Sequence, residues 1–165
     1  MYGNSTCDFI YDLPNITKND ILDAFNFIKN NDIPHVSFYS LEIKENAILK
    51  HEKYQINHLD QEDKMVYLYE LLNQSHYDRY EVSNWSKTKH FQSKHNLAYW
   101  QTKPWKAIGY GAAGFENYIN YQIKGSIDEY HKVSDKPLSQ EEYYFQILMM
   151  GLRLKSGINL KIKRN

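Results

Sequence analysis

The chain has 165 residues, and 20 Lys or Arg balance 20 Asp or Glu to give a formal net charge of zero. This balance provides no field that would steer the chain toward nucleic acid or an anionic membrane surface, and no run of about 18 apolar residues predicts a membrane span. The single cysteine, Cys7, excludes an intramolecular disulfide and a zinc or iron–sulfur site built from several of the chain's own cysteines; together with the lack of a secretory signal pattern, it predicts a cytoplasmic location.

The first half of the sequence alternates short apolar runs with amphipathic segments. CDFIY predicts a strand at 7–11, and HVSFYSL predicts a second strand at 35–41. Between them, apolar residues at three- and four-residue steps predict a helix over 19–30. Thr17 is its expected N-cap, and Asp20 completes a weak capping box.

Polar residues over 44–59 predict a loop. Asp60 is the expected N-cap of a helix at 61–75, and RYEVS predicts a third strand at 79–83. The order strand, helix, strand, helix, strand is typical of a parallel sheet with right-handed crossovers. Three parallel strands leave two edges unpaired, so we expect further strands upstream.

The second half changes character. Residues 84–122 carry aromatic residues and glycines with little helical periodicity, which predicts loops and short strands, and 115–123 is strand-like. Ser139 and Glu142 form a capping box that predicts a helix ending near Leu154.

Several residues of types that often bind ligands or metals are interpreted here as structural. Cys7 is expected to fill a small apolar site. The glycines of GYGAAG superficially resemble a phosphate-binding loop but lack its flanking strand and helix, which favours a tight packing turn at Gly109, Gly111 and Gly114. The remaining histidines show no metal-binding spacing and are interpreted as scattered surface or loop residues: His35, His51, His58, His76, His90 and His131.

The segment KHNLAYW at 94–100 resembles an HNxxYW element. Five further segments match the same family in the same order: DFIYDLPNIT at 8–17, HVSFYSLEIKE at 35–45, YEVSNW at 80–85, AIGYGAAGF at 107–115 and MMGLRLKSGI at 149–158. These collinear matches cover nearly the whole chain. The sequence resembles the C-terminal part of the HemW / oxygen-independent coproporphyrinogen III oxidase-like family of radical SAM proteins.

The resemblance implies an α/β fold in two parts. Residues 1–85 would form the last three strands of an incomplete radical SAM β/α barrel, and 86–165 would begin a HemW-type C-terminal α+β region that is expected to be incomplete. The family binds a [4Fe-4S] cluster on a CxxxCxxC loop and S-adenosylmethionine at the fourth iron position. This chain has no CxxxCxxC motif, so we expect none of its residues to be catalytic or to bind the metal. An N-terminal half or a separate chain would carry the cluster.

The HNxxYW element supplies the first candidate site, because HemW-type members are regarded as haem chaperones rather than oxidases. His95 is the expected haem contact, since neutral imidazole is a common axial ligand, and Asn96 is its neighbour without an assigned role. Tyr99 and Trp100 could stack on a porphyrin face. The alternatives are that His95 and Asn96 hold the segment by hydrogen bonds and that both aromatic residues belong to the core.

The end of the third predicted strand supplies the second candidate site. Glu81, Ser83 and Asn84 would face S-adenosylmethionine, whose amine and ribose hydroxyls need carboxylate and amide partners. The alternative is that the acidic residue, like Glu42 and Glu45 after the second strand, is a solvated loop charge.

Three departures from the family pattern bear on these sites. Asp12 and Asn15 stand where the family has glycine, and Ala113 stands where it has histidine. Asp and Asn tolerate a left-handed backbone, so the turn can survive, but close approach of a ligand is less secure.

The function expected is that of part of a HemW-like protein linked to haem or porphyrin metabolism, inactive as a radical enzyme on its own. Two alternatives stay open: a non-catalytic haem- or partner-binding module that uses HNLAYW, and a non-functional remnant with an exposed sheet edge.

Overall fold

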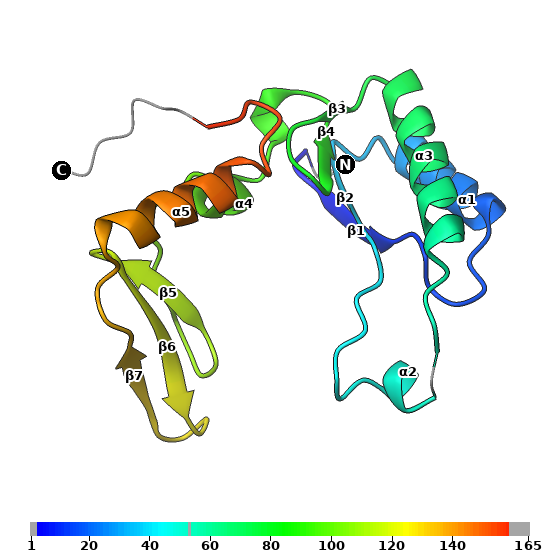
Figure 1. The fold of residues 1–165 in the computed structure, drawn as a ribbon. Helices are drawn as coiled ribbons and strands as arrows, with labels where there is room; N and C mark the ends of the chain where they lie inside the picture. Colours follow the sequence, from blue (N-terminus) through cyan, green and yellow to red (C-terminus); the bar gives the residue numbers. More distant parts are fainter. Residues whose placement is uncertain (1–2, 53, 159–165) are drawn as a thin grey trace. The chain divides into compact units, whose positions relative to one another are not determined.

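The computed structural model describes residues 3–52 and 54–158. By its internal contacts the chain divides into two compact units, unit 1 at Met1–Gln92 and unit 2 at Ser93–Asn165 (Figure 1). The predicted α/β character is confirmed, with a mixed sheet and helices in unit 1 and an antiparallel sheet and helices in unit 2.

The sheet of unit 1 has the strand order β1-β2-β4-β3. Strand β1 (Thr6–Ile10) pairs in parallel with β2 (His35–Tyr39), as the sequence predicted for its first two strands. In the described residues β1 pairs with no other strand and is therefore an edge of this sheet.

The third parallel strand predicted at 79–83 is wrong. Strands β3 (Asp78–Arg79) and β4 (Asn84–Ser86) flank a turn instead, and β4 runs antiparallel to β2 with Trp85 opposite Val36. Side-chain hydrogen bonds hold this turn, because Arg79 donates to the carbonyls of Glu81 and Val82. RYEVS carries neither Gly nor Pro, so its apolar pattern gave no sign of a reversal.

Helix α1 (Lys18–Asn30) begins where the sequence placed it. Thr17 Oγ1 accepts from the amide of Asp20 at 3.4 Å, and the Asp20 carboxylate accepts from the amide of Thr17 at 2.7 Å. This reciprocal pair is the predicted capping box, which satisfies two backbone donors at the helix end.

Helix α3 (His58–Gln74) begins three residues before the predicted start at 61. Asn57, not Asp60, is its N-cap, and the Asn57 side chain accepts from the amide of Asp60. The predicted loop at 44–59 also contains the one-turn helix α2 (Ile48–His51). Both differences occur in segments of three or four residues, which are too short to show a repeated apolar stripe.

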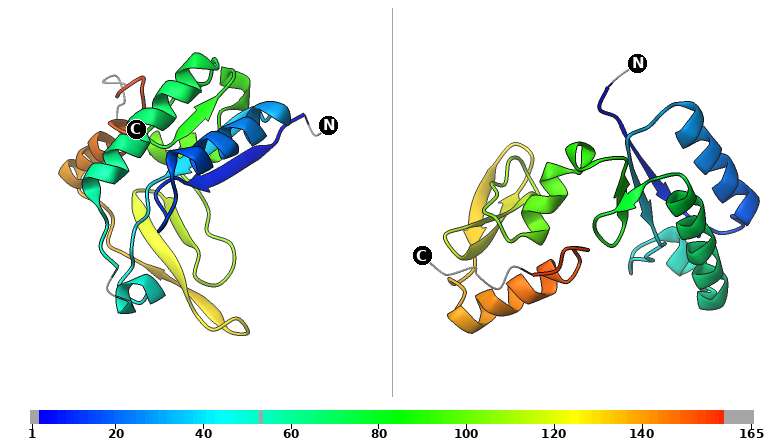
Figure 2. Two further views of the ribbon diagram at one scale, coloured as in Figure 1. Left: turned by 90° about the vertical axis from the view of Figure 1, so that its right-hand side faces the viewer. Right: turned by 90° about the horizontal axis from the view of Figure 1, so that it is seen from above.

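The core of unit 1 lies between one face of the sheet and helices α1 and α3, which pack side by side (Figures 1 and 2). Its buried apolar residues come from both helices and from the sheet: Ile21, Phe25, Ile28, Leu68, Leu72, Val36, Phe38 and Trp85. Side chains alternate along a strand. The intervening residues of β2 therefore point to the opposite face, and these are the polar His35 and Ser37.

Unit 2 contains the antiparallel strands β5 (Ala113–Glu116), β6 (Ile119–Gly125) and β7 (Tyr130–Ser134). The single strand expected at 115–123 is instead a hairpin. Its turn residues Asn117 and Tyr118 have φ of 52° and 63°, the left-handed pair that a two-residue hairpin loop requires.

Two helices of unit 2, α4 (Lys94–Trp100) and α5 (Gln140–Gly151), pack against one another. The prediction of loops and short strands over 84–122 is wrong at α4. Ser93 caps this helix by accepting from the amide of Asn96. Two turns are too short to display an apolar period. The capping box of Ser139 and Glu142 on α5 is confirmed, although α5 ends before Leu154.

Among the described helices, none has the length and apolar character needed to span a bilayer. A short 3-10 helix, η1 (Lys89–Phe91), precedes the boundary of the two units.

Candidate functional site

Helix α4 places His95 at the surface with aromatic rings behind it. The His95 ring contacts that of Tyr99 one turn later, with ring centroids 4.7 Å apart in a T-shaped arrangement. Tyr99 in turn meets Trp105 at 4.7 Å, and Trp105 meets Phe115 of β5 at 5.3 Å. The helix and this aromatic row fix an exposed imidazole on a rigid apolar support.

Trp100 does not join His95. Residues five apart on a helix project about 140° from one another, and Trp100 instead lies under the guanidinium of Arg153, 4.3 Å from its ring centroid. Its indole N–H is buried without a hydrogen-bond partner in the described residues. The structure thus brings together His95 and Tyr99 of the first candidate site and separates Trp100 from them, while the amide of Asn96 is used by the helix cap.

Glu81, Ser83 and Asn84 are brought together inside unit 1. Glu81 Oε1 accepts from the amide of Ser83 at 2.9 Å and from Nδ2 of Asn84, while Oδ1 of Asn84 accepts from the hydroxyl of Ser37 at 2.7 Å. Glu81 is 2% exposed and Asn84 is equally buried. The alternative that Glu81 is a solvated loop charge is therefore wrong.

One oxygen of this network has no partner. Glu81 Oε2 is buried and makes no hydrogen bond in the part of the chain that the structure describes. Native proteins leave few buried polar atoms unsatisfied, because each costs about 1–3 kcal/mol and a charged atom costs more. This oxygen is therefore the group in unit 1 most in need of a donor.

His35, interpreted from sequence as a surface or loop residue, is buried beside this network. Its Nδ1 lies 2.7 Å from Thr6 Oγ1 and its Nε2 lies 2.8 Å from the hydroxyl of Tyr80. Burial lowers the pKa of His35, and the carboxylates of Asp8 and Glu81 partly oppose this. The sequence did contain a signal, because HVSFYSL carries polar residues at alternate positions of a buried strand.

The stability of unit 1 should therefore depend on pH through His35. Since its folded pKa lies below the unfolded value of about 6.5, the unfolded state binds the extra proton, and the free energy of unfolding should fall as pH drops below that value. Urea unfolding followed by circular dichroism at pH 8.0, 6.5 and 5.5 should show the fall in wild type. The His35→Gln variant should lose the fall in the free energy of unfolding at low pH. The His131→Gln variant, at an exposed position, should keep it. An unchanged slope in His35→Gln would refute the assignment.

Asp12, which stands where the family has glycine, has a structural role in unit 1. Its carboxylate is buried, with Oδ1 accepting from the amide of Leu41 at 2.5 Å and Oδ2 accepting from the side chain of Gln61. Asp12 thereby ties the end of β1 to the segment after β2 and to α3. Asn15 adopts φ of 66°, which confirms that it tolerates the left-handed conformation.

The remaining sequence candidates take structural positions. Cys7 is half-buried against the core of unit 1, and burial raises the pKa of its thiol. Gly109 and Gly111 have positive φ in a turn, but an added Cβ would meet nothing there; close packing occurs at Gly114, where it would lie 2.2 Å from the Tyr121 ring. No group of three or more His, Cys, Asp or Glu within the described ranges could hold a metal ion.

Comparisons with known proteins agree on one group of relatives. The haem chaperone HemW of Lactococcus lactis is 31% identical over 95% of this chain and 44% of its own length, and that of Haemophilus influenzae is 35% identical over 92% and 42%. The haem chaperone HemW of Bacillus subtilis is 25% identical over 97% and 46%. No family model matches.

A solved structure shares the fold. The radical SAM enzyme coproporphyrinogen III oxidase (HemN) of Escherichia coli aligns with a TM-score of 0.72 and 10% identity over 93% of this chain and 41% of that one. At this identity the likeness concerns the fold alone.

Proposed function

Since this chain is HemW-like, we propose that it carries a haem-binding surface of a HemW-like haem chaperone. The chain spans less than half the length of the HemW relatives that it matches. His95 supplies the axial imidazole, and Tyr99 supports it. The relatives are named as haem chaperones, which supports haem as the ligand class. The cytoplasm is the proposed location.

The observation that carries this proposal is the exposed imidazole on an aromatic support. An axial ligand must reach the iron, so it has to be exposed, and it must keep its orientation, which the ring contact with Tyr99 at 4.7 Å provides. Trp100 and Asn96 are not placed on the haem by this geometry, because their side chains start from other faces of α4.

Replacing His95 by alanine should weaken haemin binding about tenfold or more, as expected for loss of a metal ligand. The measurement is a titration of the full chain with haemin, followed by the Soret absorption band. His90→Ala is the matched control, because His90 is also exposed and also contacts a neighbouring ring, that of Phe91 at 5.2 Å. Equal affinities for wild type and His95→Ala would end the proposal.

S-adenosylmethionine is the second ligand that we propose, at Glu81, Ser83 and Asn84. The unpartnered Oε2 of Glu81 supports it, because a methionyl ammonium group would satisfy that oxygen. The polar residues lie on the sheet face opposite α1 and α3, where a β/α barrel has its interior.

The chain's own residues do not fit a [4Fe-4S] cluster. Such a cluster in this family takes three thiolates, and the sequence contains only Cys7. We therefore propose no radical turnover by this chain alone. Such chemistry would need a polypeptide that carries the CxxxCxxC loop, either as an N-terminal half or as a separate chain.

A further inference from the structure

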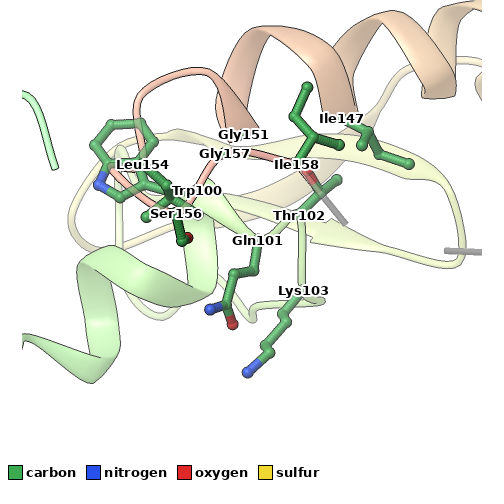
Figure 3. Close-up of a pocket in the computed structure, with 10 residues that line it drawn as sticks. All are labelled: Trp100, Gln101, Thr102, Lys103, Ile147, Gly151, Leu154, Ser156, Gly157 and Ile158. Atoms are coloured by element: carbon green, nitrogen blue, oxygen red, sulfur yellow. The ribbon is translucent and has the colours of Figure 1, made fainter. Parts of the chain in front are cut away.

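Unit 2 contains a pocket of about 360 Å³, within the size range of small-molecule sites. It lies between the end of α4, the inner side of α5 and the segment after α5 (Figure 3). Gly151 allows one end to close, since an added Cβ would lie 2.7 Å from Ile158. The lining residues are Trp100, Gln101, Thr102, Lys103, Ile147, Gly151, Leu154, Ser156, Gly157 and Ile158.

Thr102 has two unusual properties at once. It is 5% exposed, and its hydroxyl is buried without a hydrogen-bond partner among the described residues. It also has φ of 52°, a left-handed conformation that is unusual for a β-branched residue and that ends α4, because the amides of Thr102 and Lys103 donate to the carbonyls of Tyr99 and Ala98. The end of the helix accounts for the backbone conformation, so the buried hydroxyl beside the pocket is the group that a ligand would satisfy.

The polar groups around this pocket are suited to an anion. Lys103 stands at its rim next to Thr102, and no Asp or Glu is among its described lining residues. Behind the Trp100 ring lies the guanidinium of Arg153, whose Nε–H, like the indole N–H, is buried and lacks an acceptor in the described structure. Every unsatisfied atom here is a donor or, for the hydroxyl, able to donate.

The opposite wall is apolar. Figure 3 shows Ile147 and Ile158 gathered on one side of Thr102, with the side chains of Gln101 and Lys103 extending away from them. Leu154 also lines the pocket, beside Trp100. A ligand would therefore meet the Thr102 hydroxyl inside the pocket, the Lys103 ammonium at the rim and aliphatic side chains along its length.

We propose that this pocket binds an amphipathic monocarboxylate. The Thr102 hydroxyl and the Lys103 ammonium hold the carboxylate, and the aliphatic body packs against Ile147, Leu154 and Ile158. Charge-assisted hydrogen bonds to a carboxylate are stronger than neutral ones, and one would satisfy the buried hydroxyl of Thr102. The site is independent of the haem proposal, because it does not use His95.

Hexanoate is the probe, with hexan-1-ol as the ligand that lacks the charge. We expect the full chain to bind hexanoate with a dissociation constant of about 1 mM, as for other ligands of this size, and to bind hexan-1-ol at least tenfold more weakly. Binding is measured by calorimetry and by the shift of the Trp100 indole N–H in nuclear magnetic resonance, assigned with Trp100→Phe.

Thr102→Val separates a ligand role from a structural one. The change keeps the shape and removes the hydroxyl, so hexanoate affinity should fall about tenfold while thermal stability stays equal or rises, because an unsatisfied buried group is lost. Lys103→Gln, at an exposed position, should weaken hexanoate in the same direction. Exposed Thr88→Val in unit 1 is the control and should change neither quantity.

Three results would overturn the proposal. The first is no binding of hexanoate at 10 mM, which is about ten times the expected dissociation constant. The second is that hexan-1-ol binds as tightly as hexanoate. The third is that hexanoate affinity is unchanged in both Thr102→Val and Lys103→Gln. Loss of hexanoate binding in His95→Ala would also overturn it, because the site would then belong to the haem surface.

Discussion

Replacing Trp85 by alanine should lower the free energy of unfolding of unit 1 by about 4 kcal/mol, the loss typical of a buried Trp or Phe. Trp85 is 1% exposed. Its ring meets the edge of Phe38 at 6.2 Å, lies 5.3 Å from Tyr69 and sits beneath the guanidinium of Arg79 at 5.6 Å. It therefore joins β2, α3 and the turn between β3 and β4.

A loss of this size is a large part of the total stability of a small domain, about 5–15 kcal/mol, so the variant should unfold at a much lower urea concentration than wild type. Urea unfolding followed by far-ultraviolet circular dichroism is the measurement. Trp85→Phe, which keeps a ring, should lose about half as much. Trp105→Ala in unit 2 is the control for losing an indole elsewhere. A loss below about 1 kcal/mol, an ordinary value for a surface change, would show that the ring is not central.

The sequence predicted the parts of the fold that local chemistry determines. Thr17 and Asp20 form the capping box that their spacing indicates, and the first two strands pair in parallel as their helical connection requires. These features depend on residues close together in the chain. Local patterns were sufficient for them.

The errors lie where long-range or side-chain contacts decide the structure. The turn at Glu81 is held by Arg79 and by the network with Asn84, which no periodicity can display. Helix α4 is too short to show an apolar stripe, so its cap at Ser93 was the only local sign. The burial of His35 depends on Tyr80, 45 residues away.

Both candidate sites were identified through resemblance, and the structure divides the first of them. HNLAYW is one motif in the sequence, but His95 and Trp100 lie on different faces of α4. His95 contacts Tyr99, and Trp100 contacts Arg153. Asp12 shows the opposite effect. It departs from the family's glycine, and its carboxylate has a structural role, because it accepts from the amide of Leu41 and from the side chain of Gln61.

Glu81→Gln should weaken S-adenosylmethionine binding about tenfold or more, because a charge-assisted hydrogen bond to the ligand's ammonium is lost. The variant keeps the acceptor that the amide of Ser83 and the side chain of Asn84 use. It also replaces a buried carboxylate by a neutral amide of the same shape, so the fold should be preserved.

Equilibrium dialysis of the full chain against labelled S-adenosylmethionine measures the affinity, and thermal unfolding measures stability on the same samples. Glu42→Gln is the matched control, because Glu42 also follows a strand of this sheet but is exposed and paired with Lys44 at 2.9 Å. It should bind like wild type. If Glu81 serves only the internal network, its Gln variant will bind like wild type too, and the buried oxygen will have to be explained by the fold rather than by a ligand.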